Sequence, residues 1–438
     1  MSASWNKPVR ICPCLPPELW LRVFDYATWI PGVLEPEIYT TSDEPQQVIT
    51  RRQQRLLKDS LVTKRYLVRV CKQWYILATP FGILPFLIDG YPLMSLFFLR
   101  ALYETIIIGR GRTLSSLCST LADSKRKIDH SSNDHHHLGW YTKRLDVAMR
   151  DQGCQGAASE LDFLAEAIQC LPNLTIVMFS VRAPRYIKHP LPTSIMQALA
   201  DTCGPTLRIV DFSESVLHPF RHDWRVLLAA TSHLRILRGP EVTIFSEYPR
   251  PLLDLPVLSE LTTLTLTSSN SKEYLTEENH FPSLCELEFH YYLPPPWDTW
   301  VGSLGIFGHN LTAVHLNFNV SADYLQGELD VLSQHCPNLM RLTLSLKLWE
   351  QLIDRLSIPS VSHLALRCWQ YQAPSSIYSR LFANLSTMSG PTLQRVCLCD
   401  YHNVMDLRFR HARVLAQGLE QISHCPFRLE DHEGQPFT

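Results

Sequence analysis

The hydrophobic positions of this chain recur in one short pattern, apolar-x-x-apolar-x-apolar, from the middle of the sequence onward. Full copies begin at Leu174, Leu207, Leu261, Leu284, Leu311, Leu339, Val361 and Leu393, and a weaker copy begins at Leu234. Because side chains alternate between the two faces of a strand, each copy predicts a short strand whose apolar residues face a shared core. The copies are about 27 residues apart on average, a period typical of solenoid arrays built from one repeated unit.

Segments with helical spacing lie between these strands. In residues 159–173 the apolar side chains of Leu161, Leu164 and Ile168 share one helix face. A second segment, residues 193–205, ends in a Gly-Pro stop. Strand-like runs at 105–109 and 143–149 indicate that the array has begun by Leu102. Strand and helix alternating at this period predict a parallel sheet on the inner side and helices outside.

The expected fold class is therefore an α/β solenoid, and its repeats resemble leucine-rich repeats. Well-formed repeats of that family carry Asn or Cys three positions after their L-x-L, whereas this position varies here. We therefore expect an irregular leucine-rich-repeat array over residues 102–426, followed by a tail at 427–438. An ordinary α/β domain with Leu-rich strands is the alternative.

The strand residues that do not face the core are expected on the concave face of the array. They are mixed and polar, which suits the binding of a protein rather than a small molecule in a deep pocket. The candidate target-binding residues are Asp211, Thr265, Glu288, His290, His315, Asn317, Thr343 and Arg367. Each position alone is also typical of a solvated strand residue, so the prediction concerns the patch as a whole.

Two amphipathic helices are predicted nearer the N-terminus. The first follows Pro16 and Pro17, which suit a first helical turn because proline has no N–H to satisfy there. Its apolar face is Leu19, Val23, Phe24 and Ala27. The second has apolar residues at Leu67, Val70, Cys71, Trp74, Leu77 and Ala78, and it should stop before Pro80. Neither helix buries its apolar face alone, so we expect the two to pack together.

These helices resemble the two ends of an F-box, which opens with Leu-Pro-x-Glu-Leu and an Ile/Val-Phe pair and closes with Val-Cys-Lys-x-Trp. The matching residues are Leu15, Pro16, Glu18, Leu19, Val23 and Phe24, then Val70, Cys71, Lys72 and Trp74. The resemblance implies that residues 1–80 dock on a Skp-type adaptor and, through it, on a cullin. The adaptor-binding residues would be Leu15, Pro16, Glu18, Leu19, Phe24, Val70, Cys71 and Trp74. The chain would then be the substrate receptor of a ubiquitin ligase, with an unknown protein as its target.

An insert at about 28–60 separates the two helices, as in the expanded F-box-like domains of mushroom-forming fungi. Its basic residues fit a solvated helix face better than a phosphate site. The apolar stretch 81–101 is about as long as a membrane span, but Pro85, Asp89, Gly90 and Pro92 interrupt it, so no membrane anchor is predicted. We interpret this stretch as an insertion foreign to the fold, and sequencing of the transcript would show whether its codons are spliced out.

Composition narrows the class of protein further. Apolar residues make up 45% of the chain and charged residues only 19%, which argues against wholesale disorder. The net charge of -2 gives no reason to expect nucleic acid or an anionic membrane as a partner. Thirteen cysteines are scattered, several of them in apolar runs, and no secretory signal is evident. We therefore expect a cytoplasmic or nuclear protein.

The candidates for chemistry are weak. The run Asp134 to His137 is a possible metal site, but adjacent side chains diverge, its flanks indicate a loop, and no CxxC or spaced His pair supports it. None of the common nucleophile, phosphate-loop, dinucleotide or zinc-protease motifs occurs. We expect no catalytic residue, metal or cofactor. A scaffold outside any ligase, in which the F-box-like helices cap the solenoid, remains the main alternative, and an enzyme of undetected type is a third.

Overall fold

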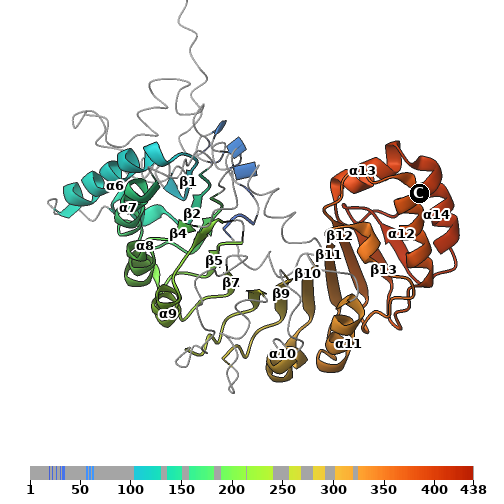
Figure 1. Cartoon of the computed structure of the whole chain (residues 1–438). Coiled ribbons are helices and arrows are strands. Elements are labelled where there is room, and N and C mark those ends of the chain that lie inside the picture. The colour runs from blue at the N-terminus through green and yellow to red at the C-terminus, as the bar shows by residue number, and fades with distance from the viewer. Residues whose placement is uncertain are drawn as a thin grey trace, which may run out of the picture.

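The structure, a computed structural model, describes residues 103–129, 136–149, 157–181, 189–213, 215–239, 256–267, 280–291, 301–318 and 324–437, with scattered residues between 19 and 63. Figure 1 shows these parts as an open arc, with strands lining the inside and helices along the outside. The predictions for residues 64–102, including the apolar stretch 81–101, lie outside the described residues.

In the described part of the chain, twelve strands form one open sheet, and every pairing is parallel. Apart from the short β4 and β6, the strands follow one another across the sheet in chain order. They are β1 (Thr105–Ile108), β2 (Arg144–Val147), β3 (Ile176–Phe179), β5 (Ile209–Asp211), β7 (Ile236–Arg238), β8 (Thr263–Thr267), β9 (Glu286–Tyr291), β10 (Ala313–Phe318), β11 (Arg341–Leu346), β12 (His363–Cys368), β13 (Arg395–Leu398) and β14 (Arg428–Glu430). The strands β4 (His189–Pro190) and β6 (Leu217–His218) pair separately. This order is that of a solenoid-like α/β fold.

Within the described ranges, helices connect most of the successive strands and cover the outer side of the arc (Figure 1). They are α6 (Leu114–Asp129), α7 (Ala157–Ile168), α8 (Thr193–Ala198), α9 (Arg221–Ala230), α10 (Val301–Phe307), α11 (Leu325–His335), α12 (Ser375–Thr387), α13 (Tyr401–Phe409) and α14 (Ala412–Ile422). Shorter turns are η1 (Gly111–Thr113), η2 (Leu138–Tyr141), the π-turn η3 (Leu199–Cys203), η5 (Gly308–Asn310) and η7 (Trp349–Gln351). The helices predicted at 159–173 and 193–205 are thus confirmed as α7 and α8 with η3.

The core lies between the sheet and the helices, and the strand pattern produces it. The parallel register places the apolar positions in rows: Leu287, Val314, Leu342, Leu364 and Val396 lie side by side, and all are at most 2% exposed. Full burial of such a side chain stabilises the fold by about 1.5–3 kcal/mol. All nine predicted strand copies are strands in the structure.

The turns before the strands lock neighbouring units together. Asn173, Asn310 and Asn338 each donate from the side-chain amide to a backbone carbonyl of the preceding unit, at 2.8–3.2 Å. Successive turns approach closely: a Cβ on Gly308 would lie 2.7 Å from the carbonyl oxygen of His335. Glycine is therefore required at this position, because any side chain would push the two units apart.

The sheet extends further than the sequence predicts. Residues 427–438 were expected to be a tail, but Arg428–Glu430 forms β14 and pairs with β13. Phe427, Leu429 and Phe437 are buried in the same core. Beyond β14 the chain turns back, so that Pro436 forms an antiparallel bridge with Glu430.

Candidate functional site

The parallel register brings the polar strand residues into two adjacent rows on the face opposite the core. The first polar row runs across β5 to β11 and consists of Asp211, Arg238, Thr265, Glu288, His315 and Thr343. The second polar row runs across β9 to β12 and consists of His290, Asn317, Ser345 and Arg367. All eight candidate target-binding residues lie in these rows.

The centre of the first polar row is a buried ionic network. Arg238 Nη1 donates to Asp211 Oδ2 across 3.0 Å, and Arg238 Nε lies 4.0 Å from Glu288 Oε2. Burial opposes the charge of Arg238, but Asp211 and Glu288 outweigh it and raise the pKa of the guanidinium. Thr265 donates its hydroxyl to Glu288 Oε2 at 3.2 Å. One buried guanidinium thus faces two carboxylates in this row.

Glu288 also links the two rows through histidines. Its Oε1 lies 3.1 Å from His290 Nε2 and 3.1 Å from His315 Nδ1. Burial opposes ionisation of Glu288, but the two histidines outweigh it and hold the pKa of this carboxyl well below its usual range. Burial in turn lowers the pKa of His315, against the pull of Glu288.

Neutral imidazoles also make these contacts, and each still favours the ionised Glu288 because it donates an N–H to the carboxylate. A neutral His315 with its proton on Nδ1 directs that proton at Glu288 and leaves Nε2 to accept from the Ser345 hydroxyl, 2.8 Å away. In the same way His290 Nδ1 accepts from the amide of Asn317 at 3.0 Å. Glu288 and His315 thus connect the two polar rows, which together we call the polar ladder.

The structure gathers the predicted target-binding residues but does not leave them open. Of the eight, only His315 and Thr343 are half-buried, and the others are buried. Their role in binding a target stays a prediction. Sequence reasoning missed Arg238, because the weak copy at Leu234 ends one residue before it, although alternation from Ile236 puts both on the same face.

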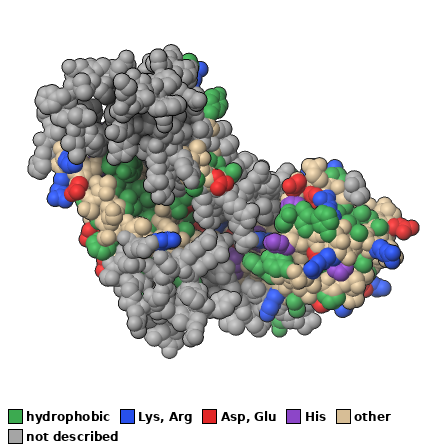
Figure 2. All heavy atoms as spheres, turned by 90° about the horizontal axis from the view of Figure 1, so that it is seen from above, with side chains coloured by type: hydrophobic (Ala, Val, Ile, Leu, Met, Phe, Trp, Pro, Cys, Tyr) green, Lys and Arg blue, Asp and Glu red, His purple; other side chains and the backbone are tan. Residues whose placement is uncertain are grey.

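Exposed aromatic side chains gather elsewhere, in the turn that follows β12 and on helix α13, which follows β13. We call Trp369, Tyr371, Tyr401, His402 and Phe409 the aromatic edge. Phe409 is 80% exposed and Tyr401 52%. The rings of Tyr371 and Tyr401 lie 5.3 and 5.5 Å from the ring of His402, both edge-to-face. Figure 2 shows hydrophobic side chains on this C-terminal limb, with basic and histidine side chains among them.

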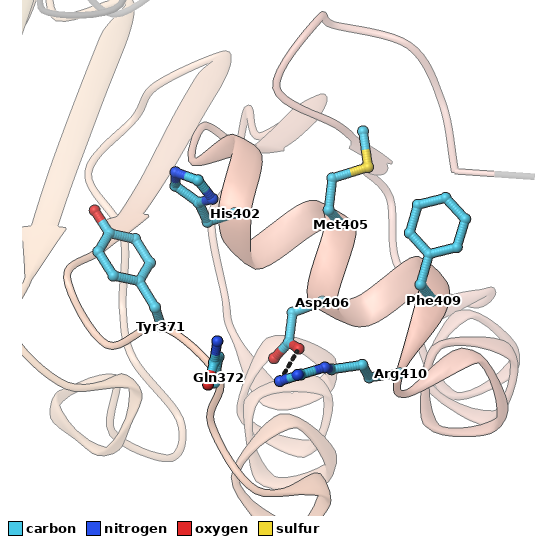
Figure 3. Close-up of a pocket in the computed structure, with 7 residues that line it drawn as sticks. All are labelled: Tyr371, Gln372, His402, Met405, Asp406, Phe409 and Arg410. Carbon is cyan, nitrogen blue, oxygen red and sulfur yellow. Dashed lines mark ion pairs between the residues drawn. The ribbon is translucent and has the colours of Figure 1, made fainter.

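A pocket of about 460 Å³ opens within the aromatic edge (Figure 3). Its lining residues are Tyr371, Gln372, His402, Met405, Asp406, Phe409 and Arg410. Asp406 accepts from the buried Tyr378 hydroxyl at 3.0 Å and lies 3.6 Å from Arg410 Nη1. Burial, with this hydrogen bond, raises the pKa of Tyr378 far above its ordinary value, so the phenol stays a donor. The pocket therefore has aromatic walls and a fixed polar floor.

Helix α13, which carries most of this lining, is held firmly at its start. Asp400 caps the helix by accepting from the backbone N–H groups of His402 and Asn403. The Asn403 side chain donates to the Cys368 carbonyl at the end of β12, at 2.8 Å. Sequence reasoning missed this site. The available signal was the aromatic content of the turns just after two strand copies, in CWQYQ and DYH.

The predicted adaptor-binding residues lie almost entirely outside the described part of the chain. Leu15, Pro16, Glu18, Phe24, Val70, Cys71 and Trp74 are not described, whereas Leu19 is helical and 44% exposed. One described residue of the insert reaches the sheet: the carbonyl of Val33 accepts from Arg144 Nη1 of β2 at 3.1 Å, and both residues are buried.

The histidines and cysteines considered as candidates for chemistry make packing or hydrogen-bonding contacts in the fold. His136 stacks on Trp140 with ring centroids 4.2 Å apart. Cys397 and Cys399 share one strand face, as alternation predicts, with their Sγ atoms 3.5 Å apart. Burial raises the pKa of Cys118 to about 12, with help from its hydrogen bond to Glu166. Among the described residues, no cluster of His, Cys, Asp or Glu has the arrangement of a metal site, and no helix combines the length and apolar character needed to cross a bilayer.

Comparison with known proteins adds no relative: no family model matches the chain, and no curated protein does so either.

Proposed function

We propose that this chain is a protein-binding receptor, and that it delivers its target to a Skp–cullin–F-box ubiquitin ligase. The observation that carries the binding half of the proposal is the aromatic edge with its pocket, displayed on a fixed helix at one end of the sheet. Exposed aromatic side chains around a hollow are typical of the centre of protein interfaces.

The ligase half rests on the F-box resemblance of residues 15–80. Leu19 supports it, because an adaptor-docking residue must lie on an accessible helix face. We interpret the strand–helix units as irregular leucine-rich repeats. We interpret the complete chain as a receptor similar to fungal proteins that have an expanded F-box-like domain. Its mechanism is proximity: the helical module fixes the chain to the ligase, and the array holds a target near the ubiquitin-charged enzyme.

A pull-down with a purified Skp-type adaptor tests the ligase half. We expect the wild-type chain to capture the adaptor, and Leu19→Asp combined with Phe24→Asp to abolish capture, because charge in a docking face is costly to bury. Leu56→Asp is the control, since Leu56 is also helical and 43% exposed but lies in the insert and is not one of the residues that match the F-box pattern. Failure of the wild-type chain to bind, or equal binding by both variants, would refute the ligase assignment.

A scaffold outside any ligase is the second candidate, and one contact favours it. The bond from Arg144 to Val33 ties part of the N-terminal region to the second strand of the array, as a cap for the solenoid would be tied. In that case Arg144→Met should lower the unfolding temperature while the chain captures no adaptor. Adaptor capture by the wild-type chain would exclude this alternative.

A further inference from the structure

The pocket in the aromatic edge also indicates what kind of segment it holds. Building on the receptor proposed above, we propose that it binds a short acidic peptide segment of the target, with one bulky apolar side chain seated in the pocket and carboxylates beside it. Two features carry this inference: the apolar walls of the pocket, and the way in which charges are distributed around it.

The walls define the anchor. Tyr371, Met405 and Phe409 line the opening, and the volume of about 460 Å³ accommodates one large side chain with part of its backbone. Phe409 is 80% exposed, so an anchor that covers it removes a large aromatic surface from water. Methionine adapts its shape to the incoming group. The anchor is therefore a Phe, Trp or Leu side chain.

The charged residues around the pocket indicate which residues should flank the anchor in the bound peptide. In two ion pairs of this region the carboxylate is buried and the cation reaches the surface: the Asp406 and Asp431 side chains are 5% and 2% exposed, whereas those of Arg410 and Arg408 are 60% and 36% exposed. Arg410 Nη1 lies 3.6 Å from Asp406, beyond hydrogen-bond distance, so its guanidinium keeps donors for a second carboxylate. The exposed Glu433 lies 3.9 Å from His432 and does not line the pocket. Of these two arginines Arg410 lines the pocket, and its exposed guanidinium presents positive charge to a ligand there.

The site is formed before any ligand arrives. Asp400 and Asn403 fix the start of α13, and Tyr378 holds Asp406 from below. A preformed site loses little conformational entropy on binding. Even a short segment is then able to bind measurably.

An array of twelve-residue peptides tests the inference with the full-length chain. Each peptide has Trp, Phe, Leu or Ala at its centre, flanked by Glu, Gln or Lys, and the strongest are measured by fluorescence anisotropy. We expect the Glu-flanked peptides with Trp or Phe to bind most tightly, and Ala at the centre to remove binding. Tyr371→Ala combined with Phe409→Ala should weaken binding of every flank series by about tenfold or more.

The charge variants separate recognition from a general surface effect. Arg410→Gln should weaken the Glu series by about three- to tenfold and leave the Gln series unchanged. Arg413→Gln, an exposed arginine on α14 outside the pocket, should change neither series. Equal binding of the Glu and Lys series, equal effects of the two arginine variants, or no binding by any peptide would overturn the inference. Adaptor capture is measured on the same preparation. If the chain captures the adaptor but binds no acidic peptide, this inference is wrong and the ligase assignment is unaffected.

Discussion

The polar ladder and the aromatic edge lie on the same sheet and have opposite character. The ladder occupies the strands themselves, consists of charged and polar side chains, and is largely buried with its charged groups in contact with one another. The aromatic edge occupies the turn beyond β12 and helix α13 beyond β13, and its rings stay exposed. The strand residues that the sequence marks as a binding surface mostly contact one another in the polar ladder. The aromatic edge, in contrast, exposes apolar side chains to solvent.

The difference separates the energetic roles of the two regions. A buried ion pair gains little net stability over an apolar pair, but the loss of one partner is costly. The polar ladder therefore favours one register of neighbouring strands over others. The aromatic edge leaves apolar area in contact with water, which a partner can cover. Three predictions test this separation, beginning with the largest effect.

Removal of one charge from the polar ladder should destabilise the fold strongly. Asp211→Asn keeps an oxygen for the hydrogen bonds from Ser213 but leaves the buried Arg238 without its closest carboxylate. We expect a loss of about 3–5 kcal/mol in the free energy of unfolding, measured by urea denaturation. The double variant Asp211→Asn with Arg238→Met should recover much of the lost free energy of unfolding, because no unpaired guanidinium is then buried.

The matched control for this variant is Asp354→Asn. Asp354 forms an exposed pair with Arg355 at 3.8 Å, with the aspartate side chain 64% exposed. Its substitution should cost no more than about 1 kcal/mol. Comparable losses for Asp211→Asn and Asp354→Asn would mean that the polar ladder is solvated and not a buried network.

The polar ladder should also make stability depend on acid. His290, His315 and Arg238 face Glu288, and against the effect of burial the two histidines hold its pKa below the ordinary value of 4.5 in the folded state. The ionised carboxylate thus stabilises the fold above pH 4.5, and this contribution is lost as the pH falls below 4.5. One such group adds a slope of up to about 1.4 kcal/mol per pH unit.

Chemical denaturation between pH 6 and 3 measures this effect. Glu288→Gln should lose less stability below pH 4.5 than the wild-type chain does. Glu433→Gln should leave the slope as it is in the wild type, because the Glu433 side chain is 71% exposed. Identical slopes for wild type and Glu288→Gln would show that this carboxyl titrates normally.

The aromatic edge should contribute least to stability. Phe409→Ala removes a ring that is 80% exposed, so we expect the free energy of unfolding to change by no more than about 0.5 kcal/mol. Phe382→Ala, which removes a fully buried ring on α12, should cost about 3–5 kcal/mol. If Phe409→Ala destabilises the chain as much as Phe382→Ala, the ring serves packing and is not a free surface.

Much of the sheet follows directly from the sequence, because strand alternation and a repeating period are local signals. The nine copies became strands, and alternation placed Glu288, His315 and the other predicted residues on one face. The last strand was missed, since Phe427 and Leu429 carry only a fragment of the pattern. Its position depends on pairing with β13, which a local pattern does not encode.

The polar ladder and the pocket in the aromatic edge were less predictable, because both depend on contacts between distant segments that a local pattern does not encode. Whether a polar strand residue is exposed depends on how the arc packs around it, and nothing in its own strand encodes that. The pocket joins Tyr371 and Gln372, which follow β12, to four residues of α13 and to Arg410 just beyond it. The α13 residues recur at the spacing of one helix face, but nothing in that spacing encodes that this face meets Tyr371 and Gln372, so the pocket emerges only from the folded chain.

The return of the chain after β14 has a consequence for association. A terminal strand of a sheet normally offers a row of N–H and C=O groups to any other strand. Here Pro436 lies antiparallel to Glu430, and the N–H of Phe437 donates to the Leu429 carbonyl at 3.2 Å. Because proline has no N–H, Pro436 offers no donor for a further strand beside β14. A second copy of the chain would therefore meet, at Leu429, an edge carbonyl that is already paired within its own chain.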